Sequence, residues 1–194
     1  MEINLSSMMQ TQLAASFFHA KENDNLKQEV DKLLGSFDLG LSGIEIKKSK
    51  EHNKLFSVHG VHSVGGKEEY LPIHYESDGT RRLLVLLKSL LSVLKNGGVA
   101  VIDEFDASLH PDISSELFDL FIQPETNPKR AQLLFSTHNH QILNQLDKYQ
   151  IVFVEKDDRG VSEVWRMDEM SGVRADDNYF SKYMAGAYGA VPKI

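Results

Sequence analysis

The sequence predicts an α/β protein with a parallel-sheet core flanked by helices, an antiparallel strand layer before that core and a helical arm at the N-terminus. Three observations support this prediction. Apolar residues recur at helical spacing over 8–35, short alternating segments fill 40–75, and apolar strands alternate with helices from about residue 80. Alternation of strands with helices is typical of parallel sheets.

Composition narrows the class of protein. The chain has 194 residues, of which 41% are apolar and 25% charged, and this is ordinary for a folded domain. A net charge of −7 argues against extensive binding of nucleic acid, so the charge gives no support for a nucleic-acid partner. The absence of cysteine excludes disulfides and thiolate metal sites. No apolar run reaches the ~20 residues that cross a bilayer, so we expect a cytoplasmic protein without a membrane partner.

The first two regions are a helical arm over 1–38 and an antiparallel strand region over 39–75. One helix is expected over 8–35, where apolar residues recur every three to four positions before Gly35. The strand region alternates apolar and polar residues between turns such as 47–53. Its strands are expected at Ile44–Ile46, Leu55–Val61 and Glu69–His74.

The third region, 76–194, should hold the parallel core. A helix over Thr80–Leu94 ends at Asn96-Gly97-Gly98, and Val99–Ile102 is a wholly apolar strand of the kind buried on both faces. Further elements follow in order: a helix over Asp112–Ile122, a second buried strand over Gln132–Phe135, a helix starting over Gln141–Leu146, and strands over Ile151–Glu155 and Val161–Arg166 around a DDRG turn. The fold of the tail from Ala175 stays open.

The strongest chemical signal is the segment VAVIDEFD, in which a buried strand ends in Asp103 and Glu104. Acids in this position lie at the carboxyl edge of the sheet, where open α/β folds bind ligands. The segment matches a Walker B motif, in which Asp103 would help to hold Mg²⁺ and Glu104 would polarise the attacking water. The plain alternative is a pair of solvated acids after a core strand.

Two further segments are candidates. In ESDGTRRL, Ser77 and Gly79 precede a long helix whose free N–H groups would favour an anion, although Ser77 or Thr80 could simply cap the helix. In LLFSTHNH, His138 follows a strand and would reach a phosphate beside the acids, unless it is only a loop histidine. We expect Arg81 and Arg82 to be a solvated helix face.

In their order, ESDGTRRL, VIDEFDASLHP, STHN, FVEKD and YGAVP resemble the C-terminal half of an ABC-type, AAA-like ATPase head over about residues 70–194. The similarity is to RloA-like predicted bacterial ATPases, related to the SMC and OLD families. It implies the P-loop NTPase (ABC head) fold, with ATP and Mg²⁺ as ligands. By position, Ser77 and Gly79 correspond to the signature loop, Asp103 to the Walker B acid, Glu104 to the catalytic glutamate and His138 to the switch histidine.

One departure from the family is the absence of a Walker A motif, since no G-x-x-x-x-G-K-[ST] occurs in the chain. The sequence therefore resembles a C-terminal lobe whose Walker A lobe is truncated, encoded separately or lost. We expect an ATPase only when such a lobe is supplied, in a homodimer or a hetero-oligomer. The resemblance implies a role in phage defence or DNA surveillance, with a nuclease effector as a partner.

Two alternatives belong to other classes. A non-catalytic interaction module would use the apolar N-terminal helix around Phe17 and Phe18 as a docking surface. A metal-dependent hydrolase or nuclease would gather a two-metal site from acids and histidines. The residues available to it are Asp103, Glu104, Asp106, His110, Asp112, His138 and His140.

Overall fold

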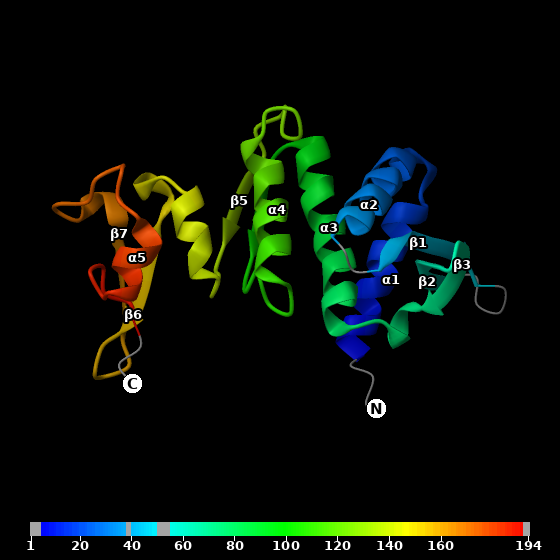
Figure 1. The fold of residues 1–194 in the computed structure, drawn as a ribbon, viewed down its shortest axis with the longest axis horizontal. Coiled ribbons are helices and arrows are strands. Elements are labelled where there is room, and N and C mark those ends of the chain that lie inside the picture. The colour runs from blue at the N-terminus through cyan, green and yellow to red at the C-terminus, as the bar shows by residue number, and fades with distance from the viewer. Residues whose placement is uncertain (1–4, 38–39, 50–54, 192–194) are drawn as a thin grey trace. The chain divides into compact units, whose positions relative to one another are not determined.

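The computed structural model describes residues 5–37, 40–49 and 55–191, so parts of the predicted arm, of the turn at 47–53 and of the tail lie outside the described residues. The chain divides into two compact units, Met1–Ser136 and Thr137–Ile194 (Figure 1). Within the described ranges, every helix falls short of the length or the hydropathy needed to cross a bilayer.

The N-terminal arm contains two helices rather than the single helix predicted over 8–35. Helix α1 spans Leu5–His19 and α2 spans Asp24–Ser36, with a 3₁₀ turn between them. The break forms around Asn23, which is buried, donates from Nδ2 to the carbonyl oxygen of Phe17 at 2.9 Å and accepts from Lys95 Nζ at 3.0 Å. The helical periodicity continues across the break, so only these tertiary contacts reveal it.

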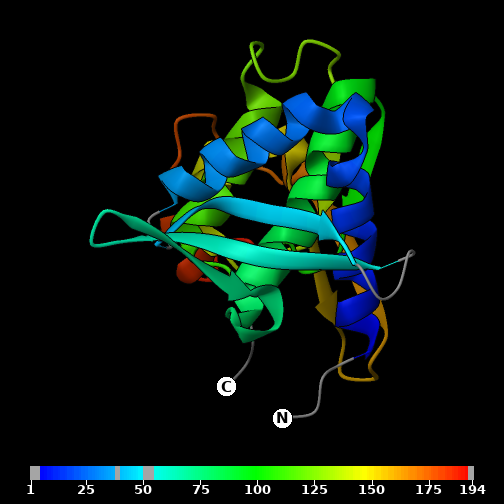
Figure 2. The same cartoon turned by 90° about the vertical axis from the view of Figure 1, so that its right-hand side faces the viewer.

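The antiparallel layer is confirmed as a three-stranded meander in the order β1-β2-β3. Its strands are β1 (Leu41–Lys48), β2 (Phe56–Val64) and β3 (Lys67–Pro72). Helices α1 and α2 lie on one side of this sheet (Figure 2). Leu26, Val30 and Leu34 line the buried face of α2 at helical spacing. Phe18 is also buried, at 1% exposure, so the docking surface expected around Phe17 and Phe18 is largely covered by the chain itself.

Helix α3, Asp78–Asn96, is the central helix of the first unit. Leu83, Leu87 and Leu90 on its inner face are fully buried. The helix ends as predicted at Gly97, which has a φ of 81° that glycine adopts without strain. The N–H of Gly97 donates to the Val93 carbonyl at 2.7 Å.

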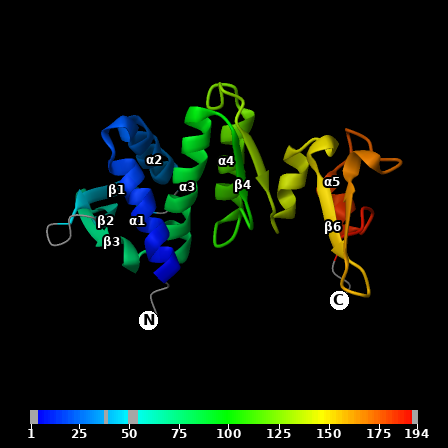
Figure 3. The ribbon, with the colours of Figure 1, turned by 180° about the vertical axis from the view of Figure 1, so that it is seen from behind.

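The predicted parallel core is present as the pair β4 (Val99–Ile102) and β5 (Gln132–Phe135), connected through α4 (Pro111–Ile122). The prediction that both strands are buried on both faces is wrong. Val99, Val101 and Leu134 are 55%, 73% and 63% exposed, and we call these three residues the outer face of the pair. Alternate side chains such as Ala100 point inward, where α3 and α4 lie beside β4 (Figure 3).

The second unit is built on an antiparallel hairpin, which confirms the strands predicted around the DDRG turn. Asp157 closes the turn, because its Oδ1 accepts the N–H groups of Arg159 at 2.9 Å and Val161 at 2.8 Å. The predicted helix start over Gln141–Leu146 is a 3₁₀ helix. The elements are η3 (His140–Gln145), η4 (Lys148–Gln150), β6 (Val152–Lys156), β7 (Ser162–Arg166), η5 (Met167–Glu169) and α5 (Tyr179–Met184).

The tail closes the core of this second unit. Tyr188 is buried in an aromatic cluster with Phe153, and its carbonyl oxygen accepts from Trp165 Nε1 at 3.2 Å. The N–H of Ala190 donates to Glu155 Oε2 at 3.1 Å, and its carbonyl accepts from the Tyr183 hydroxyl at 2.7 Å. The YGAVP segment therefore has a structural role as far as Val191.

Asp31 of α2 joins the helical arm to the three-stranded meander. Its Oδ1 accepts the N–H of Ile44 on the edge strand β1 at 2.9 Å, and its Oδ2 pairs with Lys27. Asp31→Ala should lower the free energy of unfolding by about 1–2 kcal/mol, because it leaves that N–H without its acceptor. Urea denaturation measures the change, with Lys32→Ala on the same helix as the control. Equal midpoints for the two variants would contradict this account.

Asp177 is expected to make the stability of the second unit depend on pH. The Lys182 ammonium, which lies 2.6 Å away, and then the Arg174 N–H lower the pKa of this carboxyl. A folded-state pKa below the unfolded value, about 3.9, stabilises the fold above that value and is lost as the pH falls through the folded pKa. Asp177→Asn should therefore destabilise the unit at pH 7, with a difference from wild type that vanishes in acid. Fluorescence of Trp165, the one tryptophan of the chain, reports the unfolding. Asp176→Asn is the control, and a difference that persists at pH 2–3, roughly below both values, would refute the assignment.

Candidate active site

The site begins where the parallel pair ends. Strands β4 and β5 are aligned so that Ile102 pairs with Phe135, and the residues after both strands meet at one edge. Asp103 and Glu104 follow β4 there, with both side chains exposed. We call these two residues the acidic corner. It occupies the carboxyl edge of a parallel pair, which is where α/β proteins bind ligands.

Ser136, the residue after β5, ties the acidic corner together. Its N–H donates to the Ile102 carbonyl at 3.2 Å, and its carbonyl accepts the Phe105 N–H at 2.9 Å. Its Oγ accepts the Glu104 N–H at 2.8 Å and donates to Asp103 Oδ1 at 2.5 Å. One serine thus fixes the backbone of Glu104 and the orientation of the Asp103 carboxylate.

The backbone turns sharply at Glu104. Its φ is 50°, a left-handed value that residues other than glycine rarely adopt. The next residue, Phe105, is 0% exposed, and its ring centroid lies 5.1 Å from that of Phe135. Burial of Phe105 on the inner side holds Glu104 on the solvent side. Such strained residues are found at functional sites more often than elsewhere.

The Ser77–Gly79 loop forms the start of α3. Ser77 is the N-cap, and its Oγ accepts the Thr80 N–H at 3.0 Å, so the capping alternative considered for this serine is present in the structure. A Cβ atom on Gly79 would lie 2.5 Å from the carbonyl oxygen of Ser108. Glycine is therefore required where this loop contacts the segment that follows the acidic corner.

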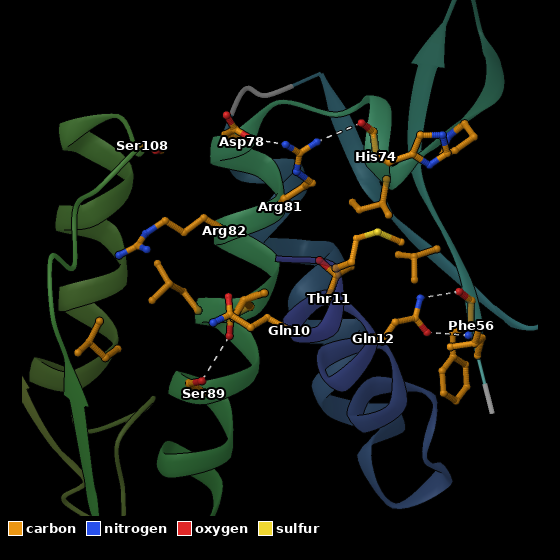
Figure 4. A pocket seen from close by; sticks show the side chains of 18 of the residues that line it. Gln10, Thr11, Gln12, Phe56, His74, Asp78, Arg81, Arg82, Ser89 and Ser108 are labelled. Carbon is orange, nitrogen blue, oxygen red and sulfur yellow. Dashed lines mark hydrogen bonds and ion pairs between the residues drawn. The ribbon is translucent and has the colours of Figure 1, made fainter. Parts of the chain in front are cut away.

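Arg81 and Arg82 are not the solvated face that the sequence suggested. Arg81 Nη1 donates to the carbonyl oxygens of His74 and Glu76, both at 3.1 Å, and its Nη2 pairs with Asp78. Arg82 extends to the opposite side of α3, toward the loop that carries Ser108 (Figure 4). Helical spacing alone does not show this, because adjacent arginines on one helix can reach different neighbours.

A groove of about 1110 Å³ lies beside these arginines in the first unit. Figure 4 shows lining residues from α1 and β2 on one side of α3, such as Gln12 and Phe56, and Ser108 on the other side. Its lining combines polar side chains with part of the outer face, and includes Gln10, Phe56, Arg81, Arg82, Val101 and Asp103. The groove therefore connects the acidic corner with an apolar strand surface.

The remaining candidates are histidines of the second unit. His138 is exposed, and its role beside the acids stays a prediction. His140, which the sequence offers only to the metal-dependent alternative, lies against Tyr183 with ring centroids 4.7 Å apart and the two rings tilted by 41°. In the part of the chain that the structure describes, no three histidine, aspartate or glutamate side chains form a metal-binding group, so the two-metal alternative gains no support.

Two residues of the site were missed by sequence reasoning. In LLFSTHNH the sequence points to His138 rather than to Ser136, although a serine directly after the strand that neighbours the one ending in the two acids is an available signal. Arg82 Nη2 donates to the carbonyl oxygen of Glu104 in the acidic corner. This contact had no such signal, because it depends on how α3 packs.

The chain is similar to known proteins in sequence and in fold. The family model of the AAA domain, putative AbiEii toxin, type IV TA system, matches residues 6–144. Septu protein PtuA of Bacillus mycoides (strain KBAB4) is 28% identical over 142 residues, which cover 67% of this chain. The match spans only 19% of PtuA, so this chain corresponds to about a fifth of that relative.

Two solved structures share the fold. One, from work titled "Structural biochemistry of ATP-driven dimerization and DNA stimulated activation of SMC ATPases", has a TM-score of 0.57 and 16% identity, covering 84% of this chain and 91% of the other. The other, an SmcHead bound to the C-winged helix domain of ScpA, has a TM-score of 0.53 and 18% identity, covering 84% and 51%. Kinship with AAA/ABC-like ATPases is thereby confirmed, whereas the narrower likeness to RloA-like and OLD proteins stays a prediction. The chain belongs to the family of AAA domains described as putative AbiEii toxins of type IV TA systems, and it has the P-loop NTPase fold of SMC ATPase heads.

Proposed function

We propose that this chain is the signature and Walker B lobe of an ABC-type ATPase and that it hydrolyses ATP only with a Walker A lobe from elsewhere. The observation that carries the proposal is the acidic corner, held by Ser136 at the carboxyl edge of a parallel pair. In this role Glu104 would polarise the attacking water, and Asp103 would help to hold the metal that accompanies the nucleotide.

The residues present fit Mg²⁺ with ATP. Mg²⁺ in nucleotide sites takes one or two carboxylates and completes its shell with phosphate oxygens and water. Asp103 is an exposed carboxylate whose Oδ1 is already oriented by the Ser136 hydroxyl. The ion would neutralise phosphate charge, and Asp103 is the residue that would hold it.

The Ser77–Gly79 loop would serve a nucleotide held by another polypeptide. It begins a helix of 19 residues, whose first N–H groups and dipole favour an anion. Gly79 packs its Cα against Ser108 and leaves the first turn without a side chain, and the Ser77 hydroxyl caps the same end. We assign both to the γ-phosphate side of such a nucleotide. His138 is assigned a different role, as the switch histidine that this chain supplies with Asp103 and Glu104 to a head completed by a Walker A lobe.

The outer face supports the need for another lobe. A parallel pair is normally covered on both faces, whereas Val99, Val101 and Leu134 are exposed, and Val101 also lines the groove of about 1110 Å³. Apolar surface of this kind marks an interface. We propose that a Walker A lobe covers it, in a homodimer or a hetero-oligomer.

The setting that we propose is bacterial phage defence or DNA surveillance, with a nuclease effector as a partner. Two findings support a defence role: the family description names a toxin–antitoxin system, and the relative in Bacillus mycoides is a Septu protein.

Calorimetry with Mg·ATP tests the dependence on a second lobe. The chain alone should give no binding heat, because its sequence lacks the Walker A motif that would cradle the β- and γ-phosphates. Addition of a Walker A polypeptide should produce binding and turnover. In that complex Glu104→Gln should keep binding and lower kcat by about 10²–10⁴-fold, the scale of a general base.

Glu116→Gln is the matched control, since Glu116 is an exposed glutamate on α4 outside the acidic corner. Tight Mg·ATP binding by the chain alone would overturn the proposed dependence. An unchanged kcat in Glu104→Gln would remove the proposed role of Glu104.

A further inference from the structure

Helix α3 contacts the segment after β4 at two points. Near its first turn, Gly79 packs against the Ser108 carbonyl so closely that a Cβ would lie 2.5 Å from the oxygen. One turn later, Arg82 Nη2 donates to the Glu104 carbonyl and lies 3.4 Å from that of Asp103. The helix that begins at Ser77 is thus connected directly to the acidic corner.

The peptide after Glu104 is held in place from several directions. The Glu104 N–H donates to Ser136 Oγ at 2.8 Å, and its carbonyl also accepts from the Ala107 N–H at 3.0 Å. Its φ of 50° is an unfavourable value for glutamate, so these partners must maintain it. The guanidinium of Arg82 is the charged donor among them, and such hydrogen bonds are stronger than those between neutral groups.

The Arg82 side chain is committed to this contact. It is partly buried, and among the described residues its Nε is buried without a hydrogen-bond partner. A buried N–H without an acceptor costs free energy. The hydrogen bond from Arg82 Nη2 to the Glu104 carbonyl is the interaction that compensates for it. Arg81 offers a contrast, since its donors serve the opposite side of the helix at His74 and Glu76 (Figure 4).

We propose that Arg82 is a positioning residue that sets the backbone of Glu104 and couples the Ser77–Gly79 loop to the Glu104 carboxylate. It contacts carbonyl oxygens of the acidic corner and acts through Glu104. When a phosphate binds to the loop, the first turns of α3 shift together with Arg82. The backbone of Glu104 shifts with them, because Arg82 is bonded to it. The coupling rests on the proposed function, whereas the positioning is testable without nucleotide.

Amide hydrogen exchange by NMR on the full chain tests the positioning. In Arg82→Gln the amides of Glu104 and Phe105 should exchange about tenfold faster, the scale of one hydrogen bond to a charged group. Core amides of α3 such as that of Leu87 should keep their rates. Arg81→Gln is the matched control and should leave Glu104 and Phe105 unchanged.

Arg82→Lys keeps a long cationic donor, so it should restore part of the protection at Glu104 and Phe105. It also decides the matter if Arg82→Gln does not fold. Unchanged exchange in Arg82→Gln, an equal effect of Arg81→Gln, or a folded Arg82→Lys with no restored protection would each overturn the positioning role.

Turnover with a Walker A polypeptide tests the coupling. Arg82→Gln should lower kcat about tenfold or more while KM for ATP stays within about twofold, and Arg82→Lys should recover part of kcat. A rise in KM as large as the fall in kcat would overturn the coupling, and so would an Arg82→Lys variant that recovers no kcat. A wild-type complex without turnover would instead overturn the proposed function, and the exchange rates would still decide the role of Arg82.

Discussion

The first unit depends on the way in which one serine closes the end of a parallel strand pair. Ser136 makes four hydrogen bonds to the segment from Ile102 to Phe105 with its N–H, its carbonyl and its hydroxyl. The pairing of Ile102 with Phe135 brings Ser136 beside Asp103. Because a shift of one residue would place another side chain there, strand register and chemistry are linked. Phe105 turns inward, Glu104 turns outward, and the chain then meets α3 at Ser108.

Much of this arrangement could be predicted because it is local. The parallel pair follows from two short apolar runs separated by a helix, and the end of α3 follows from Gly97. The acids at the strand end follow from a motif that combines an apolar strand with two carboxylates. In each case, adjacent residues carry enough physical information to define the element.

The features that could not be predicted depend on distant residues. Asn23 breaks the first helix through bonds to Phe17 and Lys95, although the apolar spacing continues past it. Val101 belongs to a run that indicates full burial, but burial depends on what lies against the strand. The contact of Arg82 with Glu104 spans 22 positions of sequence and is set by helix packing. The acidic corner was therefore predictable, whereas its supports were not.

The outer face also bears on how the chain behaves before it meets a partner. Valine and leucine on an open strand pair favour self-association, because both the side chains and the free strand edges suit another copy. In the assembly that we propose, solubility would be a shared property of the partners, and free copies would be the form most exposed to aggregation and proteolysis. A cell that makes this lobe in excess would lose the surplus first, so the abundance of the partner would set the number of working heads.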